Sequence, residues 1–489
     1  MRRAFAVALA LVGCAAAPEP GGPSLVLQPC HVRGVDEETR CGVLEVPEDP
    51  DQPEGRQIPL RVVVLPAVSA AAAGDPLFLL AGGPGQASSE IIEGLLPALK
   101  RIRERRDLVF VDQRGTGASN GLDCPEDERD PLTRMGAPID PEETRACLAE
   151  VQSKADLGFY GTRFAAEDLD AVAGALGYMT VNVFGGSYGS RLALEWARRH
   201  PERIRTLTLD GLTPPQEPIL GGSVADARAA FEALASDCAA EPGCQQLDPA
   251  ADLLALLGQA ESTPIAVRIT HPRSGLPLSI ELSGDDLAGM VRALLYTPQL
   301  AALMPLALHD ARQGDPAPLV AQAGLLGSGA VEGMSLGLTL TVLCAEDLPR
   351  LPARAEATSP SLDRIGASAQ LIFEQLCADW PRAEVDPSFY EPVELSIPTL
   401  LLSGGLDPVT PPRLGELARQ GLSNAVHGIA PGAGHGVVSL DCAPRLMRTL
   451  IEQGTVEGLE VQCLDDVGRP AFFSSKLGPS TEEASDAAD

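Results

Sequence analysis

Short runs of apolar residues recur along the first half of the chain. They span residues 57–66, 76–80, 108–111, 181–184 and 207–209. Most of these runs are apolar at successive positions, which is typical of central strands in a parallel sheet that is covered on both faces. We therefore predict that the five runs form strands of one sheet.

Helical patterns lie between the predicted strands, most clearly at residues 163–176 and 190–200. The sequence shows no internal repeat. Because strands and helices alternate, we expect an α/β fold with a mostly parallel, doubly wound sheet.

The section from residue 214 to residue 391 follows another pattern. It is rich in Ala and Leu with helical patterns, and its best strand candidate is Ile265–Ile269. A strand pattern returns at residues 398–402. We predict that the section is a mainly helical cap inserted over the sheet; an independent helical domain is the alternative. The sheet domain would then comprise residues 24–213 and 392–470.

Both ends of the chain differ from its middle. Residues 1–23 hold two arginines, a short apolar stretch and small residues, the order of an export signal, and end in a Pro/Gly-rich linker. Leu11-Val12-Gly13-Cys14 resembles a bacterial lipobox, in which the cysteine is lipidated; a cleavage site in Ala15-Ala16-Ala17 is the alternative. Residues 471–489 are polar and acidic, and we predict that they are disordered.

The charge balance narrows the range of partners. The 489 residues include 67 Asp and Glu against 37 Lys and Arg, for a formal net charge of −30. Nucleic acid is therefore not an expected partner, because phosphate contacts need a surplus of positive side chains. No segment beyond the export signal is apolar enough to span a bilayer. We expect a monomer that meets a membrane only through the lipid anchor.

The chain has 11 cysteines, of which ten remain once Cys14 is set aside. They form couples that are close in sequence: Cys30 with Cys41, Cys124 with Cys147, Cys238 with Cys244, Cys344 with Cys377, and Cys442 with Cys463. Such couples suit disulfides in an oxidising compartment, although ten cysteines allow many pairings. We expect export, either to the bacterial cell envelope as a lipoprotein or by secretion. Without a Cys-x-x-Cys motif or a histidine-rich cluster, we expect no metal and no cofactor.

The strongest chemical signal is Gly185-Gly186-Ser187-Tyr188-Gly189. It contains Gly-x-Ser-x-Gly between a predicted strand and a predicted helix, which is the context of a nucleophile elbow. The turn exposes the Ser187 hydroxyl, and the Tyr188 N–H at the helix start can hydrogen-bond a developing oxyanion. Gly83 follows another predicted strand in a glycine-rich segment. We predict its N–H as the second oxyanion donor; a simple tight turn is the alternative.

A serine nucleophile needs a base, and an acid that orients the base. Among the 6 histidines, His435 lies in a glycine-rich loop near the C-terminus, after Ser187 and a candidate acid. That acid is Asp407, which follows the strand pattern at residues 398–402, where α/β sheets place functional groups; helix capping is the alternative role. The order Ser, Asp, His is that of α/β-hydrolases. We therefore predict a catalytic triad of Ser187, Asp407 and His435.

Four motifs together carry a family resemblance. They are Gly82-Gly83-Pro84-Gly85, Asp112-Gln113-Arg114-Gly115-Thr116-Gly117, Gly185-Gly186-Ser187-Tyr188-Gly189 and Gly404-Gly405-Leu406-Asp407-Pro408-Val409-Thr410-Pro411. The set resembles secreted tripeptidyl aminopeptidases, which are relatives of proline iminopeptidases within the α/β-hydrolases. The end from Cys442 to Cys463 resembles their TAP-like region, so the resemblance covers residues 30–463. Taken alone, residues 112–117 indicate a structural turn with an Arg–Asp pair.

The resemblance implies an exported serine peptidase that releases N-terminal residues or short peptides through an acyl-enzyme on Ser187. Its partners would be short peptides with a free N-terminus. In that family acidic cap residues hold the α-amine of the substrate, and Cys344-Ala345-Glu346-Asp347 resembles that segment. We therefore expect Glu346, and secondly Asp347, to bind the amine; a solvated pair beside a structural cysteine is the alternative.

Two rival functions remain open. A carboxylesterase or lipase would use the same triad on acyl esters. A surface lipoprotein that binds a partner without catalysis would be expected to lack members of the triad, yet all three are present in order. Epoxide hydrolases and dehalogenases are disfavoured, because their nucleophile is Asp and Ser187 occupies that place.

Overall fold

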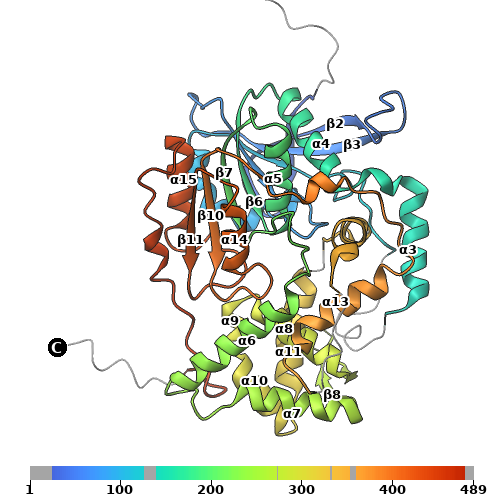
Figure 1. The fold of residues 1–489 in the computed structure, drawn as a ribbon, viewed down its shortest axis with the longest axis vertical. Coiled ribbons are helices and arrows are strands. Elements are labelled where there is room, and N and C mark those ends of the chain that lie inside the picture. Colours follow the sequence, from blue (N-terminus) through green and yellow to red (C-terminus); the bar gives the residue numbers. More distant parts are fainter. Residues whose placement is uncertain (1–24, 126–138, 272–273, 331–332, 353–359, 480–489) are drawn as a thin grey trace, which may run out of the picture.

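The computed structural model describes residues 25–125, 139–271, 274–330, 333–352 and 360–479. The predicted export segment with Cys14 lies outside this described part. The described chain forms a sheet domain with a cap beneath it in the view of Figure 1. None of its helices is long and apolar enough to cross a membrane.

The sheet domain is built on nine strands in the order β1-β2-β3-β5-β4-β6-β7-β10-β11. The strands are β1 Gln28–Val32, β2 Val35–Pro47, β3 Gln57–Leu65, β4 Leu77–Leu80, β5 Leu108–Val111, β6 Val181–Gly186, β7 Ile204–Asp210, β10 Thr399–Gly404 and β11 Ala425–Ala430. The pairings from β1 to β5 are antiparallel, and those from β5 onward are parallel. The prediction of a mostly parallel α/β sheet is confirmed.

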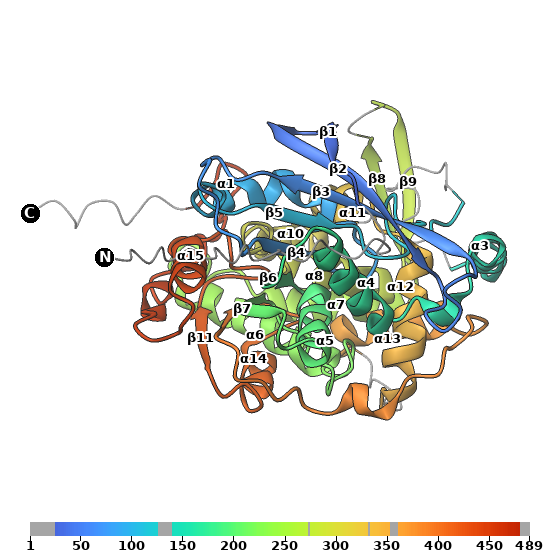
Figure 2. The same ribbon diagram turned by 90° about the horizontal axis from the view of Figure 1, so that it is seen from above.

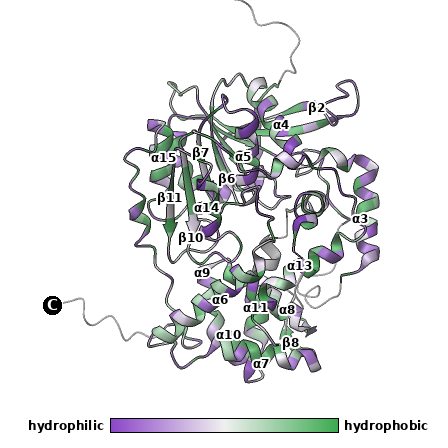
Figure 3. Ribbon diagram, in the orientation of Figure 1, coloured by the Kyte–Doolittle hydropathy of each residue, from purple (hydrophilic) through white to green (hydrophobic). Residues whose placement is uncertain are grey.

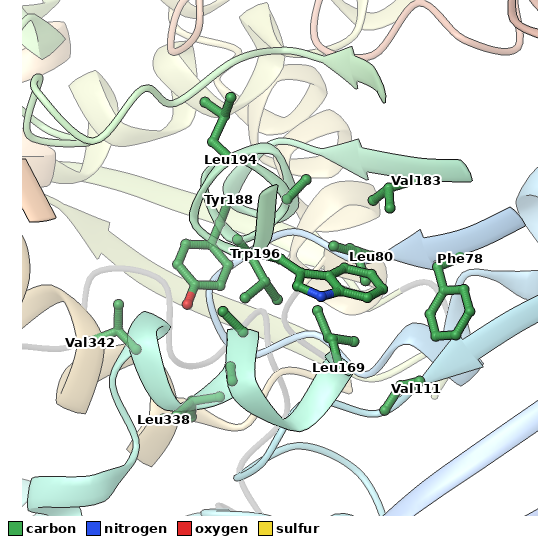
Figure 4. Packing of buried hydrophobic residues seen from close by; sticks show 14 of the residues in the cluster. Phe78, Leu80, Val111, Leu169, Val183, Tyr188, Leu194, Trp196, Leu338 and Val342 are labelled. Atoms are coloured by element: carbon green, nitrogen blue, oxygen red, sulfur yellow. The ribbon is translucent and has the colours of Figure 1, made fainter. Parts of the chain in front are cut away.

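Helices cover both faces of this sheet. Helices α1 (Ile92–Arg103) and α15 (Ala443–Gln453) pack on one face, and α4 (Thr162–Ala175), α5 (Tyr188–Arg199) and α14 (Pro412–Arg419) pack on the other. Successive residues of β4 point into the two cores in turn, Phe78 and Leu80 into one and Leu77 and Leu79 into the other. The Trp196 ring of α5 packs against Phe78, with 5.3 Å between ring centroids (Figure 4). Burial on both faces explains why the strand sequences are continuously apolar.

The chain builds the cap between β7 and β10. The cap contains α6 Ser223–Ala240, α7 Pro249–Ser262, β8 Ile265–Thr270, β9 Pro277–Leu282, α8 Gly284–Leu295, α9 Pro298–Ala301, α10 Met304–Arg312, α11 Ala317–Ala330, α12 Leu336–Val342 and α13 Arg364–Leu376. Most of its helices enclose a second hydrophobic core, whereas α12 packs into the core of the sheet domain. Figure 2, seen from above, shows the cap helices α8 and α10 behind the strands. The predicted strand Ile265–Ile269 lies in the antiparallel hairpin β8–β9.

Helix α3 (Pro141–Lys154) lies between the sheet domain and the cap. We expected this segment within the sheet domain, and its buried residues Cys147 and Val151 belong to the core of that domain; the helix also contacts α12 and α13. Arg145 on α3 lies 3.4 Å from Asp379, and Cys147 ties the helix to Cys124. Figure 3 shows hydrophilic residues along much of α3. Its sequence offers few apolar positions, and its buried contacts come from Cys147 and Val151.

The segment after the sheet domain returns to the cap. Phe472 is buried in the core of the cap, and its N–H donates to a carboxylate oxygen of Glu241 at 3.0 Å. The Phe473 N–H donates to the carbonyl of Ala302 at 3.1 Å. The prediction of disorder is therefore wrong for residues 471–479, because one aromatic anchor in a polar stretch is enough to fix it. Residues 480–489 lie outside the described part.

Five disulfides join the ten described cysteines. They are Cys30–Cys41, Cys124–Cys147, Cys238–Cys244, Cys344–Cys377 and Cys442–Cys463, the couples expected from the sequence. Each closes a local loop, with sequence separations from 6 to 33 residues. Disulfides of this number are typical of exported proteins, because cytosolic thiols are kept reduced.

Candidate active site

Ser187 lies at the turn between β6 and α5. Its backbone has φ 53° and ψ −126°, a conformation that non-glycine residues adopt at a cost of roughly 1–3 kcal/mol. The Ser187 N–H donates to the carbonyl of Asp210 at the end of β7, at 2.8 Å, and so fixes the turn to the neighbouring strand. Gly82 allows a close approach from β4, since a Cβ there would lie 2.9 Å from Ser187 Cβ. The predicted strand–turn–helix elbow is present, with Ser187 at its apex.

His435 and Asp407 come together from two loops of the sheet domain. The imidazole Nδ1 lies 2.8 Å from Asp407 Oδ2. The N–H groups of Val409 and Thr410 donate to Asp407 Oδ1, each at 2.9 Å, and the Thr410 hydroxyl donates to Oδ2. These donors satisfy the buried carboxylate and orient it toward the imidazole.

The contact shifts the pKa values of both groups. Burial lowers the pKa of His435, but the carboxylates of Asp407 and Asp210 together outweigh burial, and the pKa lies above its ordinary value. Burial raises the pKa of Asp407, but the imidazole and the hydrogen bonds from Thr410 together outweigh burial, and this pKa lies below its ordinary value. Both shifts stabilise an imidazolium facing a carboxylate, which is the charge state that a general base reaches after it takes a proton.

Two groups hold the loop that carries His435. The carboxylate of Asp210 accepts the N–H of Val437, at 2.8 and 2.9 Å, and that of Val438, at 2.8 Å. Burial raises the pKa of Asp210 to about 6, although these hydrogen bonds act in the opposite direction. From the cap, the Tyr296 carbonyl accepts the His435 N–H at 3.0 Å, and the Tyr296 ring packs edge-on against the imidazole. The imidazole is thus positioned by both the sheet domain and the cap.

Ser187 and His435 line one cleft of about 740 Å³ between the sheet and the cap. Its described walls are mainly apolar and include Ile91, Leu95, Phe184, Met334 and Val438. Among the described residues, the imidazole bonds to Asp407 and Thr410 and not to the Ser187 hydroxyl. Catalytic hydrogen bonds of this kind often form only when substrate is bound. The described residues contain no group of His, Cys, Asp and Glu suited to hold a metal ion.

Two parts of the chain match known families. Residues 75–244 match the family described as alpha/beta hydrolase fold, and residues 364–463 match the TAP-like proteins. The first match contains the elbow with Ser187, and the second contains Asp407 and His435. The chain has the α/β-hydrolase fold.

Relatives of this α/β-hydrolase include three bacterial enzymes. Serine protease Hip1 of Mycobacterium tuberculosis is 29% identical over 466 residues, covering 85% of this chain and 88% of the relative. Carboxylesterase B of the same species is 31% identical over 223 residues, 42% of each chain. Proline iminopeptidase of Neisseria gonorrhoeae is 31% identical over 140 residues, covering 28% of this chain and 33% of the relative.

Solved structures resemble this α/β-hydrolase only loosely. A proline iminopeptidase of Mycobacterium smegmatis aligns with 84% of this chain and 96% of its own, with 16% identity and a TM-score of 0.38. An esterase of Exiguobacterium antarcticum aligns with 81% of this chain and 96% of its own, with 15% identity and a TM-score of 0.37. A likeness at this level assigns no substrate.

Glu346 and Asp347 of this α/β-hydrolase do not line the cleft. Glu346 accepts hydrogen bonds from the N–H and the hydroxyl of Thr162, both at 2.7 Å, and Asp347 binds the Arg191 guanidinium at 2.9 and 3.0 Å. Their exposed fractions are 3% and 1%. Burial raises the pKa of Glu346 to about 7. The prediction that these acids bind a substrate amine is wrong in this structure, because the protein itself occupies their oxygens.

The two acids hold the segment that follows Ser187, Glu346 through Thr162 and Asp347 through Arg191 of α5. The Thr162 hydroxyl that binds Glu346 also lies 2.8 Å from the hydroxyl of Tyr188, the residue after Ser187. Gln113 donates to the same Tyr188 hydroxyl at 3.2 Å. A buried polar network of this kind fixes the side chain of Tyr188 and with it the start of α5.

The turn at residues 112–117 has the structural role that its sequence indicates. Arg114 binds Asp168 of α4 through two hydrogen bonds, at 2.6 and 2.7 Å. Asp112 instead accepts the N–H of Ser89 at 2.8 Å and its hydroxyl at 3.1 Å. The Arg–Asp pair is therefore formed with a distant helix and not within the turn.

Sequence reasoning missed three residues that position the site. Asp210 follows a predicted strand, as Asp407 does, and this signal could have identified it. Thr410 stands in the same motif as Asp407, but its hydrogen bond to the carboxylate is a matter of loop geometry. Tyr296 carried no signal, since only the folded cap brings it to His435.

Proposed function

We propose that this α/β-hydrolase is a serine peptidase that releases N-terminal residues or short peptides. The observation that carries the proposal is that Ser187 and His435 line one cleft and that the buried Asp407 is hydrogen-bonded to His435. The similarity to serine protease Hip1 over 85% of this chain supports a peptidase, and so does the similarity to a proline iminopeptidase.

In the proposed reaction Ser187 Oγ attacks the carbonyl carbon of the substrate while His435 Nε2 takes the hydroxyl proton. Asp407 holds the Nδ1 side of the ring and stabilises the imidazolium. His435 then gives the proton to the leaving amine. Water attacks the acyl-enzyme with His435 again as the base, which releases the acid product and restores Ser187.

The oxyanion would be bound by the N–H groups of Tyr188 and Gly83. Tyr188 is the first residue of α5, where N–H groups point out of the helix and the helix dipole favours negative charge. Gly83 lines the cleft beside Gly82, whose backbone passes close to Ser187. Donors fixed in place before the reaction are worth about 10²–10³ in kcat each.

The preference for a free N-terminus is part of this proposal. With Glu346 and Asp347 buried beneath the elbow, the preference does not rest on them. A carboxylesterase is the second candidate, because carboxylesterase B matches 42% of this chain. A binding protein without catalysis is the third, and the labelling experiment below addresses it.

The test is a substrate panel with purified protein. It compares aminoacyl and tripeptidyl arylamides with a free amine, their N-acetylated forms and p-nitrophenyl acyl esters. We expect the highest kcat/KM among the amides for those with a free amine, and labelling by a fluorophosphonate that Ser187→Ala abolishes. Turnover of esters without any amide would favour the esterase, and an unlabelled wild-type protein would favour the binding protein.

We also propose that the mature protein is anchored to the cell envelope by a lipid on Cys14. The five disulfides support export, and the Leu-Val-Gly-Cys sequence before residue 15 supports lipidation. Cys14→Ser should abolish incorporation of a labelled fatty acid and move the protein from the detergent phase to the aqueous phase. An unlabelled wild-type protein cleaved within residues 15–17 would show secretion without an anchor.

A further inference from the structure

Arg292 is a cationic side chain in the wall of the catalytic cleft. It lies near the end of α8 and is partly buried. Apart from His435 it is the only basic residue among the described residues that line the cleft. The acid in the same lining, Asp210, is already bound by the N–H groups of Val437 and Val438.

The Arg292 guanidinium has no counter-ion in the described part of the chain. Its Nε is buried there without a hydrogen-bond partner, and its Cζ lies 5.6 Å from the centre of the Tyr296 ring. The fully buried Arg114 and Arg191, by contrast, are each paired with an aspartate. Because the guanidinium lines the cleft without a protein counter-ion, an anionic group of a ligand in the cleft can pair with it.

The guanidinium lies on the imidazole side of the cleft. Arg292 and Tyr296 are one helical turn apart, and the Tyr296 ring is 5.3 Å from the His435 ring, centroid to centroid. The imidazole gives its proton to the leaving amine in acyl transfer. Arg292 therefore lies near the part of the substrate that departs and not near the acyl part that stays on Ser187.

We propose that Arg292 binds a carboxylate on the leaving fragment of the substrate, so that the enzyme acts on short peptides that carry this carboxylate into the cleft. A guanidinium matches a carboxylate with two parallel N–H donors. The mainly apolar walls strengthen the attraction because little water screens it. A cleft of about 740 Å³ has the size of sites for small ligands and not of an extended protein groove.

The inference rests on the proposed function, because a leaving fragment exists only if Ser187 is acylated. The carboxylate has two possible sources, namely the C-terminus of a short peptide and an acidic side chain. Both offer the same chemistry to Arg292. The arms of the experiment separate these sources.

The experiment measures kcat/KM for matched peptides that differ in one carboxylate. One arm compares tetra-alanine as free acid and as C-terminal amide, and the other compares Ala-Ala-Ala-Glu-amide with Ala-Ala-Ala-Gln-amide. We expect the wild type to prefer the acid in at least one arm by about 10- to 100-fold, the range of one charge-assisted hydrogen bond. Arg292→Gln should reduce that ratio to about one, and Arg292→Lys should restore part of it.

The quantity compared is the ratio of kcat/KM for the acid to that for the neutral peptide within each variant. Any displacement of Tyr296 or His435 would slow both peptides alike and leave this ratio unchanged. Arg268→Gln is the matched control, since it removes a positive charge from an exposed position of β8 in the same cap. Its ratio should equal that of the wild type. A wild-type ratio near one in both arms, or a ratio that survives in Arg292→Gln, would overturn the inference. If the wild type is labelled by the fluorophosphonate but cleaves none of the amides, this result would instead overturn the proposed peptidase function.

Discussion

Two groups of serine, histidine and acid occur in the described part of this molecule. They are the cleft group, Ser187, His435 and Asp407, and the edge group, Ser403, His427 and Glu416. In the edge group, His427 Nδ1 lies 2.7 Å from Glu416 and Nε2 lies 3.0 Å from the Ser403 hydroxyl. In the cleft group only the bond between histidine and acid is formed. Judged by hydrogen bonds alone, the edge group is therefore the more complete triad.

The backbone of each serine reverses that judgement. Ser403 lies inside the parallel strand β10, fully buried and paired in register with Ile429 of β11. Ser187 lies at a strained turn in front of a helix start, in the wall of a cleft. A substrate carbonyl can therefore reach the hydroxyl of Ser187 but not that of Ser403. The difference teaches that the elbow and the cleft make a catalytic serine, and that a chain of hydrogen bonds does not.

Replacing each of the two serines by alanine should give the largest difference in kcat/KM. Ser187→Ala should lower kcat/KM by about 10⁴-fold or more, because it removes the nucleophile and leaves only binding and the oxyanion donors. Ser403→Ala should change kcat/KM by less than about twofold, since no surface of the cleft is touched. Arylamide turnover and fluorophosphonate labelling of both variants are the measurements. Labelling that persists in Ser187→Ala and disappears in Ser403→Ala would reverse the assignment.

The acids of the cleft group and the edge group, Asp407 and Glu416, should also differ in their effect on kcat. Asp407→Asn should lower kcat by about 10²–10⁴-fold, because the amide no longer stabilises the imidazolium or selects its tautomer. Glu416→Gln should leave kcat and KM as they are. Steady-state kinetics on one arylamide distinguishes the variants, with thermal unfolding as a check that both are folded. Equal losses in the two variants would show that the edge group takes part in catalysis.

The sequence predicted the fold where its signals are local. Leu108–Val111 is buried on both faces of the sheet, and its continuous apolar run marks all of β5. Strand β2, at Val35–Pro47, escaped notice because its buried positions alternate with exposed polar ones near the edge of the sheet. Helix α3 was expected in the sheet domain, but nothing in its own sequence shows that it also contacts α12 and α13.

The same limit decided the outcome at the site. The elbow is a local pattern of strand, glycine, serine and helix, so Ser187 could be placed from the sequence, and the chain order then suggested its partners. Glu346 was expected to face the substrate, because an acidic motif in the sequence does not show in which direction its side chains point. Its burial depends on Thr162, which is distant in the sequence. The position of Arg292 in the cleft likewise could not be predicted, because only the folded cap brings this side chain there.

The pH dependence should follow the cleft histidine and not the histidine of the edge group. In the proposed reaction neutral His435 is the base, and the carboxylate of Asp407 raises its pKa against the effect of burial. Activity should therefore fall as the pH drops through a midpoint above about 6.5, the ordinary imidazole value, with about tenfold loss per unit below it. A profile of kcat/KM from pH 5 to 9 measures the midpoint. His427→Gln should superimpose on the wild type, and a shifted limb in that variant would contradict the comparison.

The edge group should make its small contribution to stability instead. The hydrogen bond from His427 lowers the pKa of Glu416, so this carboxylate stabilises the folded state above its unfolded pKa of about 4.3 and ceases to do so as the pH falls below it. Because Glu416 is 47% exposed, Glu416→Gln should lower the free energy of unfolding at pH 7 by only about 0.2–1 kcal/mol. Urea unfolding at pH 7 and pH 4 measures the loss, which should shrink at the lower pH. The exposed Glu394→Gln is the matched control for removal of one charge, and an equal loss in both variants would show that the edge group adds nothing.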